Sequence, residues 1–203
     1  MTRDLIAAGA AVLAPSLSLR PADGSNEELL LRIFAESHCA GFELMGLEPA
    51  ALDGLIRMQF QARQAQYRMH ADAVEYLICR GEGGAADSGS AGGADEDGVP
   101  VGSCWLAEDA EQLRVLDIAV LAEHRRQGIA RSVLDRLSAR ASEQAKPVRL
   151  SVWHANAPAL TLYRDLGFLP DPEVGGSEPG DLGNGYLELT LPARATTQPS
   201  AGA

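Results

Sequence analysis

The chain has 203 residues, which is enough for one domain with a sizeable core and short for two. Its apolar fraction of 46% and charged fraction of 22% are ordinary for a soluble globular protein. The formal net charge of −11 argues against a general nucleic-acid-binding protein, because such proteins need a broad basic surface for phosphate contacts.

The cysteines and the hydropathy of the chain argue against further classes of protein. Cys39, Cys79 and Cys104 are odd in number, lie far apart and form no C-x-x-C pair. This pattern argues against a disulfide framework or a zinc site, so we expect no metal and a reducing, cytoplasmic location. No apolar run approaches the ~18 residues of a membrane-spanning helix, and we expect no membrane partner.

The N-terminus is expected to be an extension of the folded domain. Residues 5–14 are apolar and faintly resemble the core of a signal peptide, but the flank holds one basic residue, Arg3, beside Asp4. We therefore predict that residues 1–15 form a frayed or loosely packed extension and that a single domain occupies residues 16–192.

The first half of the domain mixes strand-like and helix-like patterns. Hydrophobic periodicity and turn residues predict these elements in order: strand 16–20, helix 27–36, helix 49–70, strand 73–80 and strand 100–106. Residues 81–98 are dominated by Gly, Ala, Ser and Asp and have no apolar period. They predict a flexible loop within a β-hairpin and not a separate domain.

The second half contains a strand–helix–strand unit. The predicted elements are strand 113–120, helix 128–144, strand 147–153, helix 157–166 and strand 185–191, before a disordered tail at residues 193–203. The first three have the spacing of a parallel βαβ unit with a right-handed crossover. We therefore predict a mixed α/β (α+β) fold, with a central mixed, largely antiparallel sheet, one parallel βαβ unit and flanking helices.

The turn between strand 113–120 and helix 128–144 is the most informative motif. It is rich in Arg, contains Gly128 and opens an amphipathic helix. Unpaired N–H groups at the positive end of a helix dipole make an anion site suited to phosphate or pyrophosphate. The chain has neither a G-x-x-x-x-G-K-[ST] loop nor a G-x-G-x-x-G motif after a strand, which disfavours other common nucleotide sites.

A second motif occupies residues 156–168 on the far side of the βαβ unit. It opens at Asn156, carries Tyr163 in its short helix and ends at Gly167. Tyr163 could be a core aromatic residue. The carboxyl ends of adjacent parallel strands would nevertheless bring both motifs to one crevice, where open α/β sheets bind ligands.

Residues 116–130, followed by Asn156, Leu162-Tyr163 and Gly167-Phe168, resemble the GNAT superfamily of acyl-CoA-dependent N-acetyltransferases. The resemblance implies a GNAT-like fold and the transfer of acetyl from acetyl-CoA, as cosubstrate, to a primary amine by direct attack in a ternary complex. A non-catalytic acyl-CoA-binding regulatory module on the same fold is the alternative. Whether the acceptor amine belongs to a small molecule, a protein or a peptide is left open. A homodimer is the expected assembly.

The resemblance also assigns roles to individual residues. Main-chain N–H groups would bind the coenzyme diphosphate at Arg125, Arg126, Gln127, Gly128, Ile129 and Ala130. Ile118, Ala119 and Val120 would pair with the pantetheine arm, and Asn156 would bond to it. The Val120 N–H would face the thioester oxygen, and Tyr163 would protonate the departing thiolate.

The base that takes the amine proton has two candidates. Asp117 lies on the key strand, although it could instead bond to backbone or to an Arg, and His154 lies at the end of the next strand. His38 and His70 belong to no recognisable constellation. Arg126 stands where the family commonly has Gly, so its side chain must point away from the phosphates or act on them as an added charge.

Overall fold

The computed structural model describes residues 17–39, 41–81, 98–171 and 185–193. The predicted extension at residues 1–15 therefore lies outside the described residues, as do most of the predicted loop and almost all of the predicted tail.

Seven strands and four α-helices are formed by the described residues, in the order β1 (Leu17–Pro21), α2 (Glu27–His38), α3 (Pro49–Arg68), β2 (Val74–Arg80), β3 (Val99–Glu108), β4 (Leu113–Val120), α4 (Ile129–Glu143), β5 (Val148–Trp153), α5 (Ala157–Asp165), β6 (Leu169–Pro170) and β7 (Tyr186–Leu191). Three short 3-10 helices accompany them: η1 (Gly24–Asn26), η2 (Phe42–Met45) and η3 (Ala122–His124). Every strand and α-helix predicted from periodicity is present, with ends shifted by a few residues. The two-residue strand β6 was not predicted.

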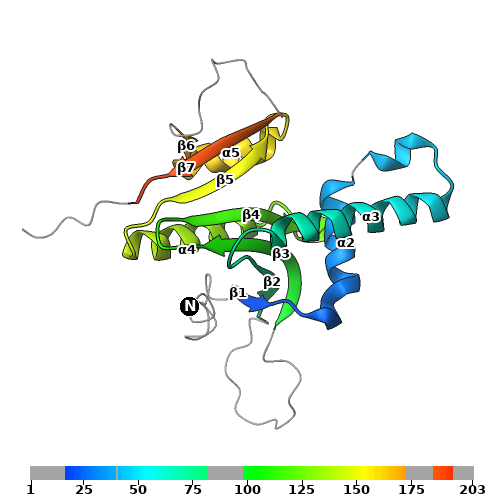
Figure 1. Cartoon of the computed structure of the whole chain (residues 1–203), viewed down its shortest axis with the longest axis horizontal. Helices are drawn as coiled ribbons and strands as arrows, with labels where there is room; N and C mark the ends of the chain where they lie inside the picture. The colour runs from blue at the N-terminus through cyan, green and yellow to red at the C-terminus, as the bar shows by residue number, and fades with distance from the viewer. Residues whose placement is uncertain (1–16, 40, 82–97, 172–184, 194–203) are drawn as a thin grey trace, which may run out of the picture.

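The strands form one sheet in the order β1-β2-β3-β4-β5-β7-β6 (Figure 1). Among the described strands, β4 and β5 form the one parallel pair, and the other neighbours are antiparallel. This confirms the predicted fold class. The parallel pairing joins only Leu113–Val115 to residues 148–150, so the two strands part over their carboxyl halves.

Helices cover both faces of the sheet with separate apolar layers. On one face, α2 and Phe60 of α3 pack against Leu77 and Ala119. On the other face, α4 and α5 pack against alternate residues of the same strands, such as Ile78 and Val101. The predicted apolar side of α4 is buried, at Ile129, Val133, Leu134, Leu137 and Ala141. Since strand side chains alternate between faces, β2 and β4 contribute to both layers.

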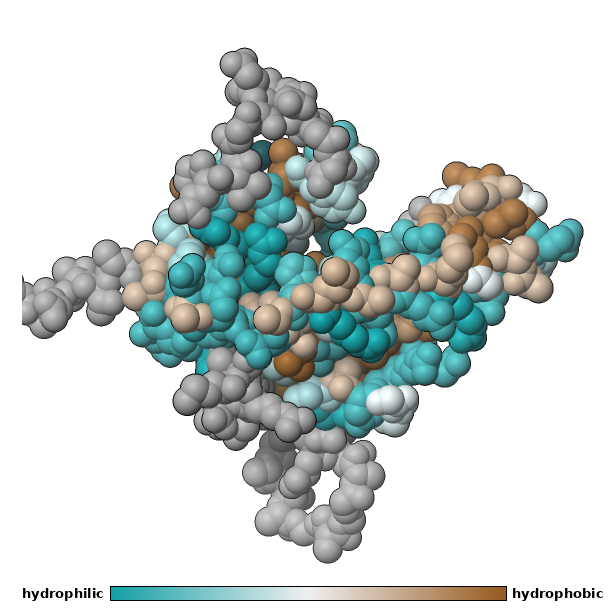
Figure 2. Space-filling view, viewed as in Figure 1, coloured by the Kyte–Doolittle hydropathy of each residue, from teal (hydrophilic) through white to brown (hydrophobic). Residues whose placement is uncertain are grey.

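The α2–α3 arm ends in an exposed apolar surface. Leu44, Met45 and Leu47 lie between α2 and α3 and are exposed, as is Met58 of α3, and Figure 2 shows apolar surface gathered over this end of the molecule. Among the described helices, none has both the length and the apolar character needed to cross a membrane.

Candidate active site

A cleft of about 820 Å³ opens where β4 and β5 part. One wall comes from α2 and α3, including His38 and Tyr67, and another comes from β5, α5 and β7, including Trp153 and Tyr163. The floor is the second half of β4, residues 116–120. The cleft therefore reaches both faces of the sheet, and the parting of the parallel strands makes it possible.

The β4 edge that faces this cleft has no strand partner among the described residues beyond Val115. Leu121 donates its N–H to Val101 O at 3.0 Å, on the β3 side. Because backbone groups alternate along an antiparallel ladder, the N–H groups of Ile118 and Val120 point to the opposite, open edge. An extended polar arm can pair with this edge as an added strand would.

The turn that leads into α4 presents a run of free amides. In the described part of the chain, the N–H groups of residues 126–131 have no hydrogen-bond acceptor, and Ser132 is the first to bond, to Gly128 O at 2.9 Å. No side chain caps the helix. A Cβ built on Gly128 would meet no protein atom within 4 Å, so the space beside this residue is open. Open space and unpaired donors at a helix N-terminus fit a diphosphate.

Arg125 differs from the other residues of the predicted diphosphate site. Its N–H donates to Ala122 O at 3.2 Å, so this amide is already paired within the protein, unlike the others of the turn. Its side chain turns inward instead. Nε donates to Val120 O at 2.9 Å, and Nη2 donates to Glu36 O at 2.9 Å and to Ser37 Oγ at 3.3 Å. Arg125 thus connects α2, β4 and the turn.

Arg126 has a positive φ of 63°, in the left-handed region. The resemblance places a Gly at this position, and Gly adopts such a conformation without the crowding that a Cβ causes. Arg126 adopts this conformation although it carries a Cβ. The Arg126 side chain is exposed and has no ion pair or hydrogen bond to the other described residues, so it can add charge to the anion site.

Tyr163 reaches the cleft from α5. Its ring is buried against Phe168, with a centroid distance of 5.7 Å, and its hydroxyl has no hydrogen-bond partner among the described residues. Burial, with a smaller contribution from the charge of Asp117, raises the pKa of Tyr163 to about 12. The hydroxyl is therefore protonated near neutral pH and available as a donor. Asn156 also lines the cleft, and its Oδ1 accepts the Ala159 N–H at 3.2 Å as the cap of α5.

The two base candidates lie in different surroundings. Asp117 lines the cleft and lies 3.2 Å from His38 Nε2, with each side chain about one-fifth exposed. His154 is exposed, packs on Trp153 with a centroid distance of 4.6 Å and does not line the cleft. The geometry therefore favours Asp117. Among the described residues, no group of three or more His, Cys, Asp or Glu side chains is placed to hold a metal ion.

Sequence reasoning missed several polar residues of this region. His38 and Arg63 line the cleft from α2 and α3, and Glu75 lies behind it on β2. One signal was available for Glu75, because a carboxylate flanked by Val74 and an apolar run inside a strand needs a reason to be there. His38 gave no such signal, since it ends a helix two residues after the predicted end.

Solved structures of other proteins share this fold. A domain from Methanocaldococcus jannaschii superposes with a TM-score of 0.55 at 13% identity, covering 87% of this chain and 99% of that one. An acetyltransferase from Thermus thermophilus gives 0.54 at 20% identity, with 87% and 97% covered. The PaiA N-acetyltransferase from Thermoplasma acidophilum, solved in complex with coenzyme A, gives 0.53 at 14% identity, with 87% and 99% covered.

At these identities the similarity shows the fold alone, and no curated protein matches the chain. The family is shown by the sequence instead. Residues 54–168, more than half of the chain, match the acetyltransferase (GNAT) family. This range runs from α3 to the end of the Tyr163 motif, and it contains the open edge of β4, the turn of free amides and Asp117. The protein therefore belongs to the GNAT acetyltransferase family.

Proposed function

We propose that the protein transfers an acetyl group from acetyl-CoA to a primary amine by direct attack in a ternary complex. The observation that carries this proposal is the content of one cleft: an open strand edge, a carboxylate and a protonated phenol. The turn of free amides lies at the start of α4, which follows that strand.

The chain's own groups would hold the cosubstrate at three places. The free N–H groups of residues 126–131 would bind the diphosphate, the open edge at Ile118 and Val120 would pair with the pantetheine arm, and the side-chain amide of Asn156 would donate to it. Bound in this way, the thioester supplies an activated acetyl group. Its carbonyl would lie beside the Val120 N–H, which stabilises negative charge developing on oxygen.

Two side chains on opposite faces of the sheet would move protons. An alkylamine has a pKa of about 10, so a base must take its proton before it can attack. Asp117, on the α2–α3 face, would be that base. Tyr163, on the α4–α5 face, would donate its proton to the departing thiolate sulfur. The acceptor would then enter between α2 and α3, and the cosubstrate would enter from the other face.

We also propose the kind of acceptor and the cellular compartment. The acceptor wall includes Ser37, His38, Arg63, Tyr67 and His70, which suits a polar amine of a small molecule or a peptide. A cytoplasmic location is supported by the three cysteines, which are odd in number, far apart in the chain and buried.

Thiol release from acetyl-CoA tests the proposal. The acceptor panel contains spermidine, Nα-blocked lysine, an alanyl peptide and 2-phenylethylamine, and calorimetry with acetyl-CoA is run in parallel. Binding together with amine-dependent thiol release would support acetyl transfer. Saturable binding with no release for any amine would instead favour a non-catalytic acyl-CoA-binding module. The absence of binding would refute both functions.

A further inference from the structure

The side of α3 that faces the cleft, with the turn after it, is a row of hydrogen-bond donors. Four side chains from this segment line the cleft, at spacings of three and four residues: Arg63, Gln66, Tyr67 and His70. Residues three and four apart lie on the same side of a helix. Each of the four can donate a hydrogen bond, and none carries a carboxylate. This wall therefore suits an anionic group on the acceptor.

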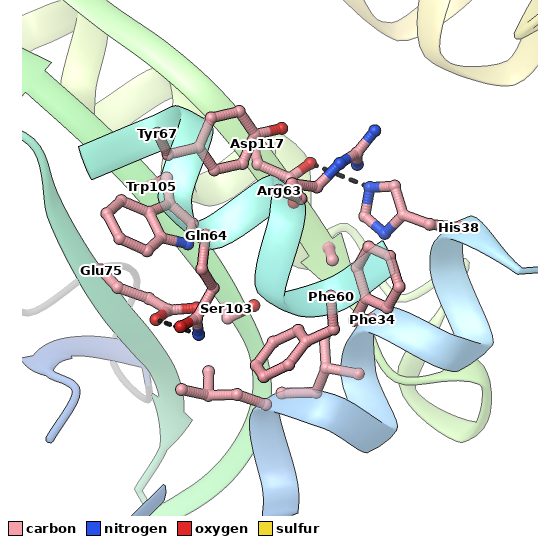
Figure 3. Close-up of a pocket in the computed structure, with 13 residues that line it drawn as sticks. Phe34, His38, Phe60, Arg63, Gln64, Tyr67, Glu75, Ser103, Trp105 and Asp117 are labelled. Carbon is pink, nitrogen blue, oxygen red and sulfur yellow. Dashed lines mark hydrogen bonds and ion pairs between the residues drawn. The ribbon is translucent and has the colours of Figure 1, made fainter. Parts of the chain in front are cut away.

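Arg63 supplies the charge of this wall. Its guanidinium carbon lies 5.7 Å from the ring centroid of Phe34 and 5.8 Å from that of Tyr67, so the two rings hold the group in place. The side chain is partly buried and makes no hydrogen bond or ion pair with the other described residues. Figure 3 shows it extending from α3 beside the Asp117–His38 pair. A partly buried cation without a counter-ion is stabilised by an anion that a ligand brings.

The other arginines of the described cleft are already bonded. Arg114 pairs with Glu188 at 3.3 Å, which also accounts for one of the two carboxylates of the cleft. Arg125 donates to main-chain carbonyls of β4 and α2. The opposite charges left to receive a ligand are therefore Arg63 and Asp117.

Arg63 and Asp117 lie near each other. Both line the cleft, and both also line an enclosed space of about 20 Å³ behind it, which is close to the volume of one water molecule. The Tyr67 hydroxyl senses both charges: burial raises its pKa, the Asp117 charge raises it further and the Arg63 charge lowers it. This phenol is protonated, faces the cleft and has no hydrogen-bond partner among the described residues. A cation, an anion and a neutral donor thus surround the acceptor side of the cleft.

We propose that the acceptor is an amino acid, whose amine lies at Asp117 and whose carboxylate is bound by Arg63 and Tyr67. A guanidinium group can bond to both oxygens of one carboxylate. In the transfer, a bond forms between the amine nitrogen and the acetyl carbon, and the C–S bond breaks. The amine proton passes to Asp117, and the thiolate takes the proton of Tyr163. The products are an N-acetyl amino acid and free coenzyme A. This specificity rests on the proposed acetyl transfer.

Thiol release with paired acceptors tests the proposal. L-Alanine, L-phenylalanine and 4-aminobutyrate are each compared with the corresponding amide, in which an uncharged group of similar size replaces the carboxylate. For at least one pair, kcat/KM should favour the acid roughly tenfold or more, as expected for a hydrogen bond between charged groups. At pH 8 an α-amino amide has more of its amine as free base than the amino acid has. Amine basicity therefore cannot produce the expected preference.

Variants at one position of α3 identify the group responsible. Arg63→Gln should abolish the preference for the acid, mainly through a higher KM for the amino acid. Arg63→Lys should keep part of it, because an ammonium group retains the charge but not the planar fork. Arg57→Gln is the matched control and should keep the full preference, since Arg57 lies on the same helix, pairs with Asp53 at 3.1 Å and lines neither space. Calorimetry with acetyl-CoA should show that all three variants still bind the cosubstrate and are folded.

Calorimetry with the three amino acids, in the presence of coenzyme A, gives a readout that does not depend on transfer. At least one should bind saturably to the wild type, and Arg63→Gln should weaken this binding roughly tenfold or more.

The outcomes separate the two proposals. Binding that depends on Arg63 without thiol release from any acceptor would refute acetyl transfer and support the carboxylate site. Release from the amides as fast as from the acids, or an acid preference that survives in Arg63→Gln, would refute the carboxylate site and leave acetyl transfer standing. The absence of both amino-acid binding and thiol release would refute both.

Discussion

His38 Nε2 lies 3.2 Å from Asp117 Oδ1, which joins the last residue of α2 to the open half of β4. An ionised carboxylate only accepts hydrogen bonds, so Nε2 is the donor of this contact when Asp117 is ionised. His38 Nδ1 is buried without a partner among the described residues. The pair orients the Asp117 carboxylate at the cleft and fixes the carboxyl end of α2 against the sheet.

Asp117→Asn tests the base. An amide cannot take the amine proton, so kcat/KM should fall by roughly 10²-fold or more. The oxygen of Asn can still accept from His38, so the fold should be retained. Acetyl-CoA affinity, measured by calorimetry, should not change, because the free amides and the open edge of β4 are untouched. Turnover equal to that of the wild type would exclude Asp117 as the base.

His38→Gln and His38→Leu form a matched pair for the orienting role. Gln keeps a hydrogen-bond donor that can reach Asp117, whereas Leu leaves the half-buried carboxylate without a donor from this position. We expect His38→Gln to retain most of the activity and His38→Leu to lose roughly 10-fold or more in kcat/KM, in line with the cost of losing a hydrogen bond to a charged group. Equal activity of the two variants would show that the contact does not orient the base.

Tyr163→Phe should lower kcat roughly 10²-fold and leave the KM for acetyl-CoA nearly unchanged, because it removes only the proton donor. The ring contact with Phe168 remains, so Tm should stay close to that of the wild type. Since the pKa of Tyr163 is raised to about 12, its ionisation should produce no loss of activity between pH 6 and about 10 in the wild type. Full activity of the variant would remove Tyr163 from the role of acid.

Most of the fold was predictable because each element carries its own periodicity. Period-2 patterns located the longer strands, and the 3.6-residue period located α4 with its buried side. Strand β6 was missed because two residues hold no pattern, and it exists only through pairing with β7, as in Leu169 with Thr190. The parting of β4 and β5 follows from no local signal in the sequence.

Only the parts of the site that depend on backbone geometry could be predicted from the sequence. Free amides at the start of α4 follow from helix geometry, whatever the side chains are. The inward turn of Arg125 depends on Glu36, 89 residues earlier in the chain, and the Asp117–His38 contact spans 79 residues. Such contacts depend on how α2 packs on the sheet, which no local pattern specifies. The same holds for Glu75, whose burial arises from packing against α3.

Gly128→Val should weaken acetyl-CoA binding as well as destabilise the fold. The added Cβ meets no protein atom within 4 Å, but it occupies the space beside the free amides, and φ at this residue is 76°. The left-handed conformation costs roughly 1–2 kcal/mol for a residue with a Cβ. Calorimetry should show a loss of affinity of at least roughly tenfold, or about 1.4 kcal/mol. Unchanged affinity would place the diphosphate elsewhere.

Arg125→Ala should destabilise the protein and reduce acetyl transfer together. Its side chain makes three hydrogen bonds, to Val120 O, Glu36 O and Ser37 Oγ, and so holds α2 beside the open end of β4. Their loss should lower the free energy of unfolding by about 1–3 kcal/mol.

Arg131→Ala is the control for this loss of stability, because among the described residues the Arg131 side chain pairs only with exposed Asp165, and its loss should cost less than about 1 kcal/mol. Arg125→Lys should lose stability much as Arg125→Ala does. A single ammonium group cannot donate to Val120 O and Glu36 O at once, as the guanidinium group does. Urea unfolding and thiol release measure the two effects. Normal stability with lost acetyl-CoA binding would instead make Arg125 a direct phosphate ligand.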